Sequence, residues 1–501
     1  MKKIIIIGAG IGGLSTGCYA QMNGFDTQIF EMHNLPGGVC TAWKRKGYTF
    51  DGCIHHLAGC RPASNLYQLW RELGVFPHPI HYPEDLIAIE SPEGKRMVVY
   101  ADIDRFERHL LDLSPQDEEV ILEITAAARR FARLNILDLL MAPPWQMLKV
   151  VPYLGLIQKW GSKKLEDVAS RFKDPFLRRA FAQIQYDFPD IPAMIAQIFI
   201  AGVSTYDLGF PEGGALEFAR KIEQRYLSLG GKIQYHSKVE KILVDSNGHS
   251  DRAIGIQLTD GSQYFADVIV SNADGFSTIY HMLEGRYTTP TIEKYYQDFP
   301  KNQVMSLHVS LGINMDFSDQ PHALVLWLPE SIEIAGEMVD RLDLEFYNFA
   351  PEMAPQGKST LKVTCSSSYE YWADLKSHGD DQYNADKNQI ASLIINQLER
   401  RFPGLHQQVE VIDVATPLTT ERFAGSFHGY QAWAIPAQSP MEALQGKGLS
   451  KTLPELENFH MVGQWAGGLG LPNVAVMGRK LVQSLCKQER RRFVTSVTSE
   501  N

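Results

Sequence analysis

A glycine-rich turn near the start of the chain has the residue types and spacing needed to bind a pyrophosphate. Gly8, Gly10, Gly12 and Gly13 follow the apolar run at residues 3–7 and precede a helical pattern. Gly8 permits a tight turn out of a strand, Gly10 lets the backbone approach a phosphate, and Gly13 lets helix and strand pack closely. The helix that follows would offer free N–H groups and a partial positive charge to an anion. The turn therefore predicts a dinucleotide site.

An acidic residue follows at the position where such sites bind a ribose. Glu31 ends the second apolar run, residues 26–31. Its carboxylate can accept hydrogen bonds from the adenosine ribose hydroxyls, and it would repel a 2′-phosphate. This turn and acid alone do not separate NAD from FAD.

Two further glycine-rich segments could reach an extended ligand. Gly37 and Gly38 follow Pro36, soon after Glu31, and paired glycines allow close backbone approach. Near the other end of the chain, residues 458–465 read as a strand that ends at Gly463, and glycines at 467–470 precede a helix start. A helix N-terminus there would point at the polar chain or ring of a bound flavin.

The elements that must position these residues form a βαβ opening. The patterns predict a strand at 3–7, a helix at 11–23 stopped by Gly24, and a strand at 26–31. In the middle, 232–244 reads as strand, and 253–259 with 262–271 reads as a hairpin about Asp260-Gly261. The end predicts a strand at 459–462 and a helix at 471–489. Further strands are expected at 305–313, 324–328, 342–349, 361–366 and 409–414, and helices at 115–140, 214–229 and 388–402.

Nucleotide-type signals thus fall at the start, the middle and the end of the chain. They predict an α/β fold in which a discontinuous dinucleotide-binding domain, residues 1–79, 206–289 and 446–489, carries an inserted domain. The inserted mixed α+β domain is expected from residues 80–205 and 290–445, and residues 490–501 form a tail.

Composition narrows the functional class. The chain has 501 residues, of which 44% are hydrophobic and 21% charged, which is globular. The formal net charge is -10, whereas a nucleic-acid-binding protein is expected to be basic, so nucleic-acid binding is not expected. Six cysteines without a C-x-x-C pair indicate reduced thiols in a cytoplasm-like compartment and no zinc or other metal site. Cys53 and Cys60 are near enough in sequence to face each other, although core filling is favoured.

Membrane-spanning segments are not expected. The first apolar run is interrupted by the glycine turn, which excludes a signal peptide, and no stretch of about 18 uncharged apolar residues exists. The most apolar region, 131–160, is broken by Asp138, Lys149 and Lys159, so it fits a core or a membrane surface but not a span. The basic run 490–492 reads as a solvated helix end, with contact to anionic lipid as the alternative.

With these motifs in place, the sequence resembles the FAD-dependent amine-oxidase-like superfamily, and within it the phytoene desaturase, carotenoid isomerase and retinol saturase group. The resemblance covers nearly the whole chain. It rests on the glycine turns, on Glu31, and on Pro211-Glu-Gly-Gly214, Gly230-Gly231 and Ser271-Asn-Ala-Asp274. It implies a Rossmann-like FAD-binding domain with a substrate domain inserted in it. It also implies that the Val239 backbone contacts the adenine and that the flavin is bound by Gly463, Gln464, Leu471, Pro472, Asn473 and Val474.

Two departures from the family pattern concern the flavin side. The family often has an acid where Gln464 stands. Its saturase-like members have Gly-Ile-His-Tyr after Phe-Asp, whereas this chain has Phe50-Asp-Gly-Cys-Ile-His-His56. His55 and His56 are the candidates for a catalytic proton shuttle near the flavin, and a structural role as loop histidines remains open.

The resemblance implies an FAD-dependent oxidoreductase that acts on C–C or C=C bonds of a lipophilic polyene, a carotenoid or polyisoprenoid, as a desaturase or saturase. Alternatives are a carotenoid cis–trans isomerase that uses reduced FAD, a flavin amine oxidase, and a non-catalytic prenyl-lipid binder like the Rab GDP-dissociation inhibitors. No second GxGxxG unit is present, so electrons are expected to pass to or from an external partner of unidentified chemistry. A cytoplasmic protein with peripheral membrane contact and no nucleic-acid partner is expected.

Overall fold

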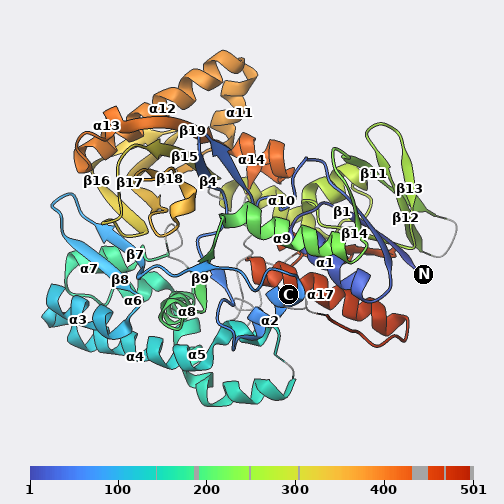
Figure 1. Ribbon diagram of the computed structural model, residues 1–501, viewed down its shortest axis with the longest axis horizontal. Helices are drawn as coiled ribbons and strands as arrows, with labels where there is room; N and C mark the ends of the chain where they lie inside the picture. The colour runs from blue at the N-terminus through green and yellow to red at the C-terminus, as the bar shows by residue number, and fades with distance from the viewer. Residues whose placement is uncertain are drawn as a thin grey trace.

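The computed structural model describes residues 1–142, 144–185, 191–246, 250–302, 305–430, 449–467 and 470–496. Figure 1 shows two halves, each built around a sheet. One half contains the first and last helices, α1 and α17, and the other contains a large sheet between two groups of helices. The predicted domain boundary at 445/446 and the motif residues Gly468 and Leu469 lie outside the described residues.

The first sheet is parallel and takes its strands from the start, the middle and the end of the chain. Every strand pair in it is parallel. The isoleucine-rich central strand is buried on both faces, which suits a parallel sheet covered by helices. Its strands run in the order β10 (Lys232–Gln234), β2 (Asp26–Phe30), β1 (Lys3–Ile7), β14 (Val268–Ser271) and β21 (Phe459–Met461). The predicted α/β class with a Rossmann-like sheet is confirmed.

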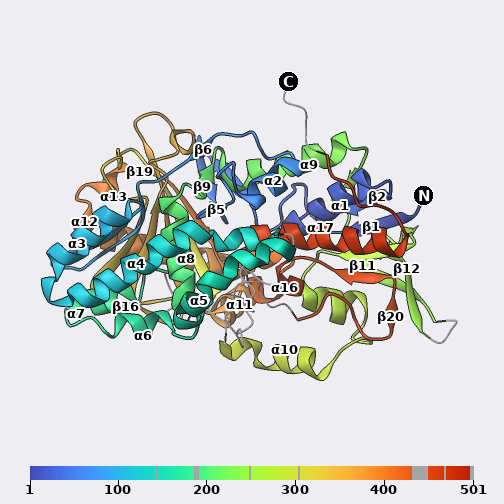
Figure 2. The same cartoon turned by 90° about the horizontal axis from the view of Figure 1, so that it is seen from below.

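Helices from distant parts of the chain cover this sheet. α1 (Ile11–Met22) and α17 (Leu471–Gln488) lie side by side in Figures 1 and 2. The Ser15 hydroxyl donates to the Ala475 carbonyl at 2.7 Å, and a Cβ atom on Gly478 would lie 2.7 Å from the Thr16 nitrogen. α9 (Gly214–Ser228) packs on α1 through the Tyr226 ring.

The predicted hairpin in the middle of the chain is only partly right. β11 (Val239–Asp245), β12 (Asp251–Leu258) and β13 (Gln263–Phe265) form an antiparallel ladder, but residues 268–271 leave it and become β14. Burial explains the difference, because every residue of β14 is buried and the strand pairs with β1. Just before β14 begins, the Asp267 carboxylate accepts the Lys3 N–H at 2.8 Å. The expected strand 232–244 is likewise divided into β10 and β11.

The second sheet joins both blocks of the predicted inserted domain. Two of its strands come from before residue 101, and the rest from residues 305–415. The first two were not predicted, because the strand with which they form the sheet lies far along the chain. The order is β19 (Val409–Ala415), β15 (Met305–Ile313), β18 (Ser359–Ser367), β17 (Glu337–Phe346), β16 (Ala323–Ile334), β7 (Asp85–Glu90) and β8 (Arg96–Tyr100). The ends of β17 and β16 differ from the expected 342–349 and 324–328.

Helices lie on either side of this sheet. α11 (Tyr369–Ser377) and α12 (Asp380–Arg401) lie above it in Figure 1, and α12 begins earlier than the expected residue 388. Below it lie α3 (Ile103–Leu113), α4 (Glu118–Leu134), α5 (Leu154–Gly161) and α8 (Ala193–Ser204). The expected helix 115–140 ends at Leu134, where Asn135 takes a φ of 44°.

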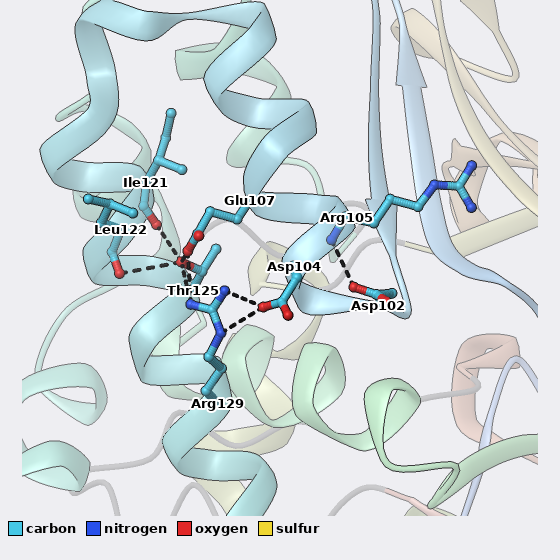
Figure 3. A network of polar contacts seen from close by, with 8 residues as sticks. All are labelled: Asp102, Asp104, Arg105, Glu107, Ile121, Leu122, Thr125 and Arg129. Atoms are coloured by element: carbon cyan, nitrogen blue, oxygen red, sulfur yellow. Dashed lines mark hydrogen bonds and ion pairs between the residues drawn. The ribbon is translucent and has the colours of Figure 1, made fainter.

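One arginine ties α3 to α4. Figure 3 shows that the Arg129 guanidinium donates to Asp104 at 2.6 Å and to Glu107 at 2.8 Å. Arg129 lowers the pKa of the Glu107 carboxyl, so this ion pair stays charged at neutral pH. The two ion pairs link α3 to α4.

Shorter elements lie between these, together with single helical turns at 115–117, 136–140, 277–282, 351–353 and 427–429. The shorter elements are β3 (Ala42–Arg45), β4 (Tyr48–Asp51), β5 (Leu57–Ala58), α2 (Asn65–Glu72), β6 (Ile80–His81), the 3-10 helix η3 (Pro144–Tyr153), α6 (Leu165–Ala169), α7 (Pro175–Phe181), β9 (Leu208–Pro211), α10 (Pro290–Asn302), α13 (Leu405–Gln408), α14 (Pro417–Ala424), β20 (Leu456–Glu457) and α16 (Gln464–Gly467). Among the described residues, no helix is both long enough and apolar enough to cross a bilayer.

Candidate functional site

The first glycine turn joins β1 to α1 and has no room for side chains. Gly8 takes a φ of 93° and donates its N–H to the Phe30 carbonyl at 2.8 Å. A Cβ atom on Gly13 would lie 2.2 Å from the Gly8 carbonyl oxygen, so only glycine fits there. α1 starts after Gly10 without a side-chain cap and without an acid in its first turn. Its first N–H groups are therefore suited to a phosphate.

Glu31 lies beside this turn. Its Oε2 accepts the Ala9 N–H at 2.7 Å and its Oε1 accepts the His33 N–H at 2.8 Å. Each carboxylate oxygen has two lone pairs, so each can still accept a hydroxyl. The Glu31 carbonyl accepts the Ser237 N–H at 2.8 Å, which brings the start of β11, and with it the buried Val239, close to the acid. The predicted ribose and adenine contacts thus share one end of the site.

The second glycine turn packs on the first. The Gly37 N–H donates to the Ala9 carbonyl at 2.9 Å, and Gly37 forms a parallel bridge with Gly10. Gly37 has a φ of 108°, and a Cβ atom there would lie 2.1 Å from the Cys40 carbonyl oxygen. A Cβ atom on Gly38 would lie 3.7 Å from the Gly10 Cα, so both predicted glycines line the same turn.

The two ends of the chain meet at Asn272. A Cβ atom on Gly12 would lie 2.5 Å from Asn272 Oδ1 and 3.1 Å from the Gly463 nitrogen, and one on Gly10 would lie 2.5 Å from Asn272 Nδ2. Asn272 follows β14, so three distant segments converge on one amide side chain. Asn272 belongs to the Ser271-Asn-Ala-Asp274 motif but was not among the predicted site residues. Its position directly after a buried strand could have identified it as a site residue.

The first turn of α17 faces the same end of the molecule as that of α1. From one contact to the next, the residue numbers rise in both segments: Gly12 lies near Gly463, Ser15 contacts Ala475, and Asn23 contacts Val494. The helices therefore run in the same direction, and their positive N-terminal ends lie together. α17 starts after Gly470 with no side-chain cap and no acid in its first turn. Gln464 begins α16, and Leu471, Pro472, Asn473 and Val474 form the first turn of α17.

The two histidines occupy different environments. The His55 side chain is 49% exposed, and its Nδ1 contacts Oε1 of Glu345 on β17. The Nδ1 atom of His56 is buried without a hydrogen-bond partner among the described residues, and its ring meets that of His322 edge-on. Burial and the neighbouring His322 lower the pKa of His56 well below its usual value. The His56 ring is therefore neutral at physiological pH, and the His55 side chain is accessible to solvent.

Cys53, which lies near Cys60 in the sequence, has another cysteine as its neighbour. β3 and β4 pair Ala42 with Asp51, and continuing this ladder sets Cys40 opposite Cys53. A hydrogen bond with Cys53, together with burial, raises the pKa of the Cys40 thiol well above its usual value. All six cysteines are free thiols. In the part of the chain that the structure describes, no group of three or more His, Cys, Asp or Glu side chains could hold a metal ion.

Comparison with known proteins agrees with this geometry. Residues 6–73 match the NAD(P)-binding Rossmann-like domain family. The chain is 25% identical to the prolycopene isomerase of Arabidopsis thaliana, over 84% of this chain and 72% of that protein. It is 25% identical to a lycopene-forming phytoene desaturase of Paracoccus, over 96% and 97%. It is 23% identical to the all-trans-retinol 13,14-reductase of Danio rerio, over 92% and 82%. The predicted resemblance to this group of enzymes is confirmed.

A solved structure supports the same fold. An oxidoreductase from Methanosarcina mazei superposes with a TM-score of 0.61 at 18% identity, covering 96% of this chain and all of that one. The fold is therefore shared over nearly the whole chain, including the part inserted between the segments of the parallel sheet.

Proposed function

We propose that the chain is an FAD-dependent oxidoreductase that acts on C–C or C=C bonds of a lipophilic polyene, a carotenoid or polyisoprenoid, as a desaturase or saturase. The observation that carries the proposal is the convergence of Gly10, Gly12 and Gly463 on Asn272, with Glu31 at the other end of the same turn. The names of the relatives add a substrate class, since they refer to a carotene isomerase, a phytoene desaturase and a retinol reductase.

The residues around Asn272 fit FAD. The turn at Gly8–Gly13 would hold the pyrophosphate, Glu31 the ribose, and the Val239 backbone the adenine. Two uncapped helix N-termini at one end of the site favour a ligand with phosphates and a polar ring. Residues that approach the turn from the far end of the chain would contact the flavin half: Gly463, Gln464, Leu471, Pro472, Asn473 and Val474.

Bound FAD would supply the hydride acceptor or donor that side chains lack. The chain itself must bind the polyene, orient it and exclude water. The half-exposed His55 is our candidate for the proton that accompanies hydride transfer, and we assign His56, whose Nδ1 atom is buried, to packing. Electrons would pass to or from an external partner.

An apolar surface supports peripheral membrane contact by a cytoplasmic protein. Four large side chains on η3 and α5 are more than half exposed: Trp145 at 71%, Leu148 at 72%, Val151 at 58% and Leu154 at 53%. We call these four residues the apolar patch. They lie within the region 131–160, which the sequence marks as the most apolar. A polyene is held in lipid, so a surface that enters the headgroup layer would give it a route to the protein.

The isomerase alternative has support of its own, because a curated relative is named for that activity over 84% of this chain. It would need reduced FAD with no net electron transfer. An amine oxidase and a prenyl-lipid binder remain alternatives on the same fold.

The test is anaerobic incubation of the purified yellow protein with a panel of polyenes, followed by chromatography of the pigments. New or lost double bonds are expected for the redox proposal, with one flavin reduced or oxidised per bond. Cis–trans conversion that needs only catalytic dithionite would favour the isomerase. Oxidation of amines alone would contradict both, and a protein that stays colourless with added FAD would favour the lipid binder.

A further inference from the structure

The hairpin of β3 and β4 ends in two opposed cysteines at its open end. One position beyond the last residues of the two strands, the Gly52 N–H donates to the Thr41 carbonyl at 2.9 Å, so the ladder continues there. The next opposed pair in the same register is Cys40 and Cys53. Two thiols therefore stand at the base of the hairpin.

The backbone at this pair suits a disulfide. The Cys40 N–H donates to the Gly37 carbonyl at 3.1 Å and the Cys53 N–H donates to Asp51 Oδ1 at 2.9 Å, so neither N–H bonds across the ladder. The cysteines thus form a non-hydrogen-bonded antiparallel pair, in which opposed Cα atoms lie about 4.5 Å apart. Disulfides span Cα separations of about 4.4–6.8 Å. A bond between the two sulfur atoms would therefore break no backbone hydrogen bond.

The two side chains face each other from different depths. Opposed residues of a ladder project to the same face, and the two thiols are hydrogen-bonded to each other. Cys40 is only 1% exposed, and its thiol donates to the Ala215 carbonyl at 3.6 Å. Cys53 is partly exposed. A small oxidant in solution therefore reaches Cys53 first, and Cys40 is the buried thiol behind it.

The charge state of Cys40 gives the same order. The hydrogen bond with Cys53, together with burial, raises the pKa of the Cys40 thiol well above its usual value, so this thiol stays protonated at neutral pH. The thiolate, not the thiol, attacks an oxidant. Oxidation is therefore expected to begin at Cys53.

The third cysteine of this part of the chain belongs to another strand pair. β5 pairs with β9, and the Cys60 thiol donates to the Leu57 carbonyl of β5 at 3.1 Å. The Cys60 N–H donates to the Asp207 carbonyl, just before β9, also at 3.1 Å. Cys60 is thus held beside β9 and has no part in the β3–β4 ladder, which makes it a matched control.

We propose that Cys53 and Cys40 form a reversible disulfide on exposure to a hydroperoxide, and that this bond closes the base of the hairpin beside the second glycine turn. The Cys53 sulfur attacks a peroxide oxygen: an S–O bond forms, the O–O bond breaks, and two electrons pass to the peroxide, which leaves as water or an alcohol. The Cys40 sulfur then attacks the Cys53 sulfur. An S–S bond forms, the S–O bond breaks, and the leaving hydroxide takes the Cys40 proton as water. A low-molecular-weight thiol reverses the reaction by exchange.

The bond would restrict the segment that carries the second glycine turn. Cys40 follows Gly37 by three residues and donates to its carbonyl, and Gly37 forms a parallel bridge with Gly10. A covalent link from Cys40 to Cys53 leaves fewer open conformations to the chain between them. Oxidation thus limits local opening next to the first two glycine turns, with or without a bound cofactor.

Thiol counting and peptide mapping test the bond. The full chain is reduced, freed of reductant and exposed to hydrogen peroxide, and its thiols are counted after denaturation. The count should fall by two, from six to four, and dithiothreitol should restore it. Cleavage after Lys44 separates Cys40 from Cys53, so trypsin should release two peptides joined by a disulfide that tandem mass spectrometry assigns to this pair. A count that stays at six, or a disulfide between Cys53 and Cys60, would overturn the proposal.

Three variants separate the roles of the thiols. Cys53→Ser should keep all of its five thiols under the same peroxide. Cys40→Ala should leave oxidised Cys53 as a sulfenic acid that dimedone labels, because no second thiol displaces the oxygen. Cys60→Ala is the control and should lose two of its five thiols as the disulfide forms. A disulfide that forms in Cys40→Ala, or fails to form in Cys60→Ala, would refute the assignment.

Hydrogen exchange tests the closure of the hairpin. In the wild type, the amides of residues 41–52 should exchange about tenfold or more slowly after oxidation, and dithiothreitol should restore the rates. Cys53→Ser treated with the same peroxide should show no change. A disulfide that forms without slowing exchange would refute the closure. None of these measurements needs FAD or substrate, so their outcome is independent of the proposed function.

Discussion

A Cβ atom on Gly12 would lie 3.1 Å from the backbone nitrogen of Gly463, so the first and last parts of the chain touch at the proposed flavin site. Gly12→Ala should therefore push α1 away from the Gly463 turn, because backbone cannot yield as a side chain can. We expect FAD affinity at least tenfold weaker, measured by flavin fluorescence on titration. Gly155→Ala on α5 is the control, since a Cβ atom there meets nothing within 4 Å. Equal affinity in both variants would contradict the proposed site.

Replacing the carboxylate of Glu31 tests its double role. The amide introduced by Glu31→Gln would keep one acceptor oxygen but would set an NH2 group against one of two backbone donors, Ala9 or His33. A hydrogen bond to a charged group contributes about 1.5–3 kcal/mol, so Glu31→Gln should weaken FAD binding roughly tenfold or more. Isothermal titration of the apoprotein measures this. Glu337→Gln, at an exposed carboxylate, should bind FAD as the wild type does.

The apolar patch should be needed for lipid binding and not for folding. Trp145→Ser combined with Leu148→Ser should reduce partitioning into phosphatidylcholine–phosphatidylglycerol vesicles about tenfold or more, because each side chain contributes roughly 1.5–3 kcal/mol when it is buried in apolar surroundings. Co-sedimentation measures the partition, and the thermal midpoint should stay within about 1 °C. The matched control is Leu227→Ser with Met338→Ser, at residues that are 46% and 67% exposed elsewhere. Equal partitioning of both double variants would exclude the patch as the contact.

Asp274 predicts an unusual pH dependence of stability. Burial raises the pKa of its carboxyl to about 7, while Oδ1 accepts the Phe276 N–H at 2.9 Å and Oδ2 has no partner among the described residues. In the unfolded chain the pKa is about 4. Between these values the folded state holds a proton that the unfolded state has lost, so stability falls as pH rises from about 4 to 7.

Asp274→Asn removes that titration and keeps the acceptor oxygen. The free energy of unfolding of the variant, minus that of the wild type, should rise by about 2–3 kcal/mol between pH 5 and pH 7.5. Urea denaturation at the two pH values measures it. Asp319→Asn, at an exposed carboxylate, should give a difference that does not change with pH. A flat difference for Asp274→Asn as well would refute the buried protonated carboxyl.

The proposed nucleotide end of the site could be predicted from the sequence because its residues lie close together in the chain. Gly8 and Gly13 are required by the turn itself, and Glu31 ends the strand beside it, so neighbours in sequence are neighbours in space. The parallel sheet was identified for the same reason, since the unbroken apolar run of β1 indicates burial on both faces. The end of the predicted helix at Leu134 was missed, because Asn135 stops it through backbone conformation and not through proline or glycine.

Contacts between segments far apart in the sequence could not be predicted from it. β7 pairs with β16, and β14 pairs with β1 and not with the strands of the predicted hairpin. The sequences of the strands do not indicate either pairing. Likewise, Glu345 and Lys362 were not among the residues predicted for the site. They form a buried pair in contact with the Asp51 carbonyl, which comes from a distant segment, so this pair could not be predicted from residue types and spacing.

The parallel sheet has a consequence for synthesis. Its edge strand β21 and the helix α17 come from residues 459–488, whereas its centre is β1. At a translation rate of about 5–20 residues per second, the central strand waits roughly half a minute or more for its last partners to leave the ribosome. During that interval the nascent chain carries an incomplete nucleotide fold, and a premature stop codon anywhere before α17 leaves a polypeptide that cannot close it.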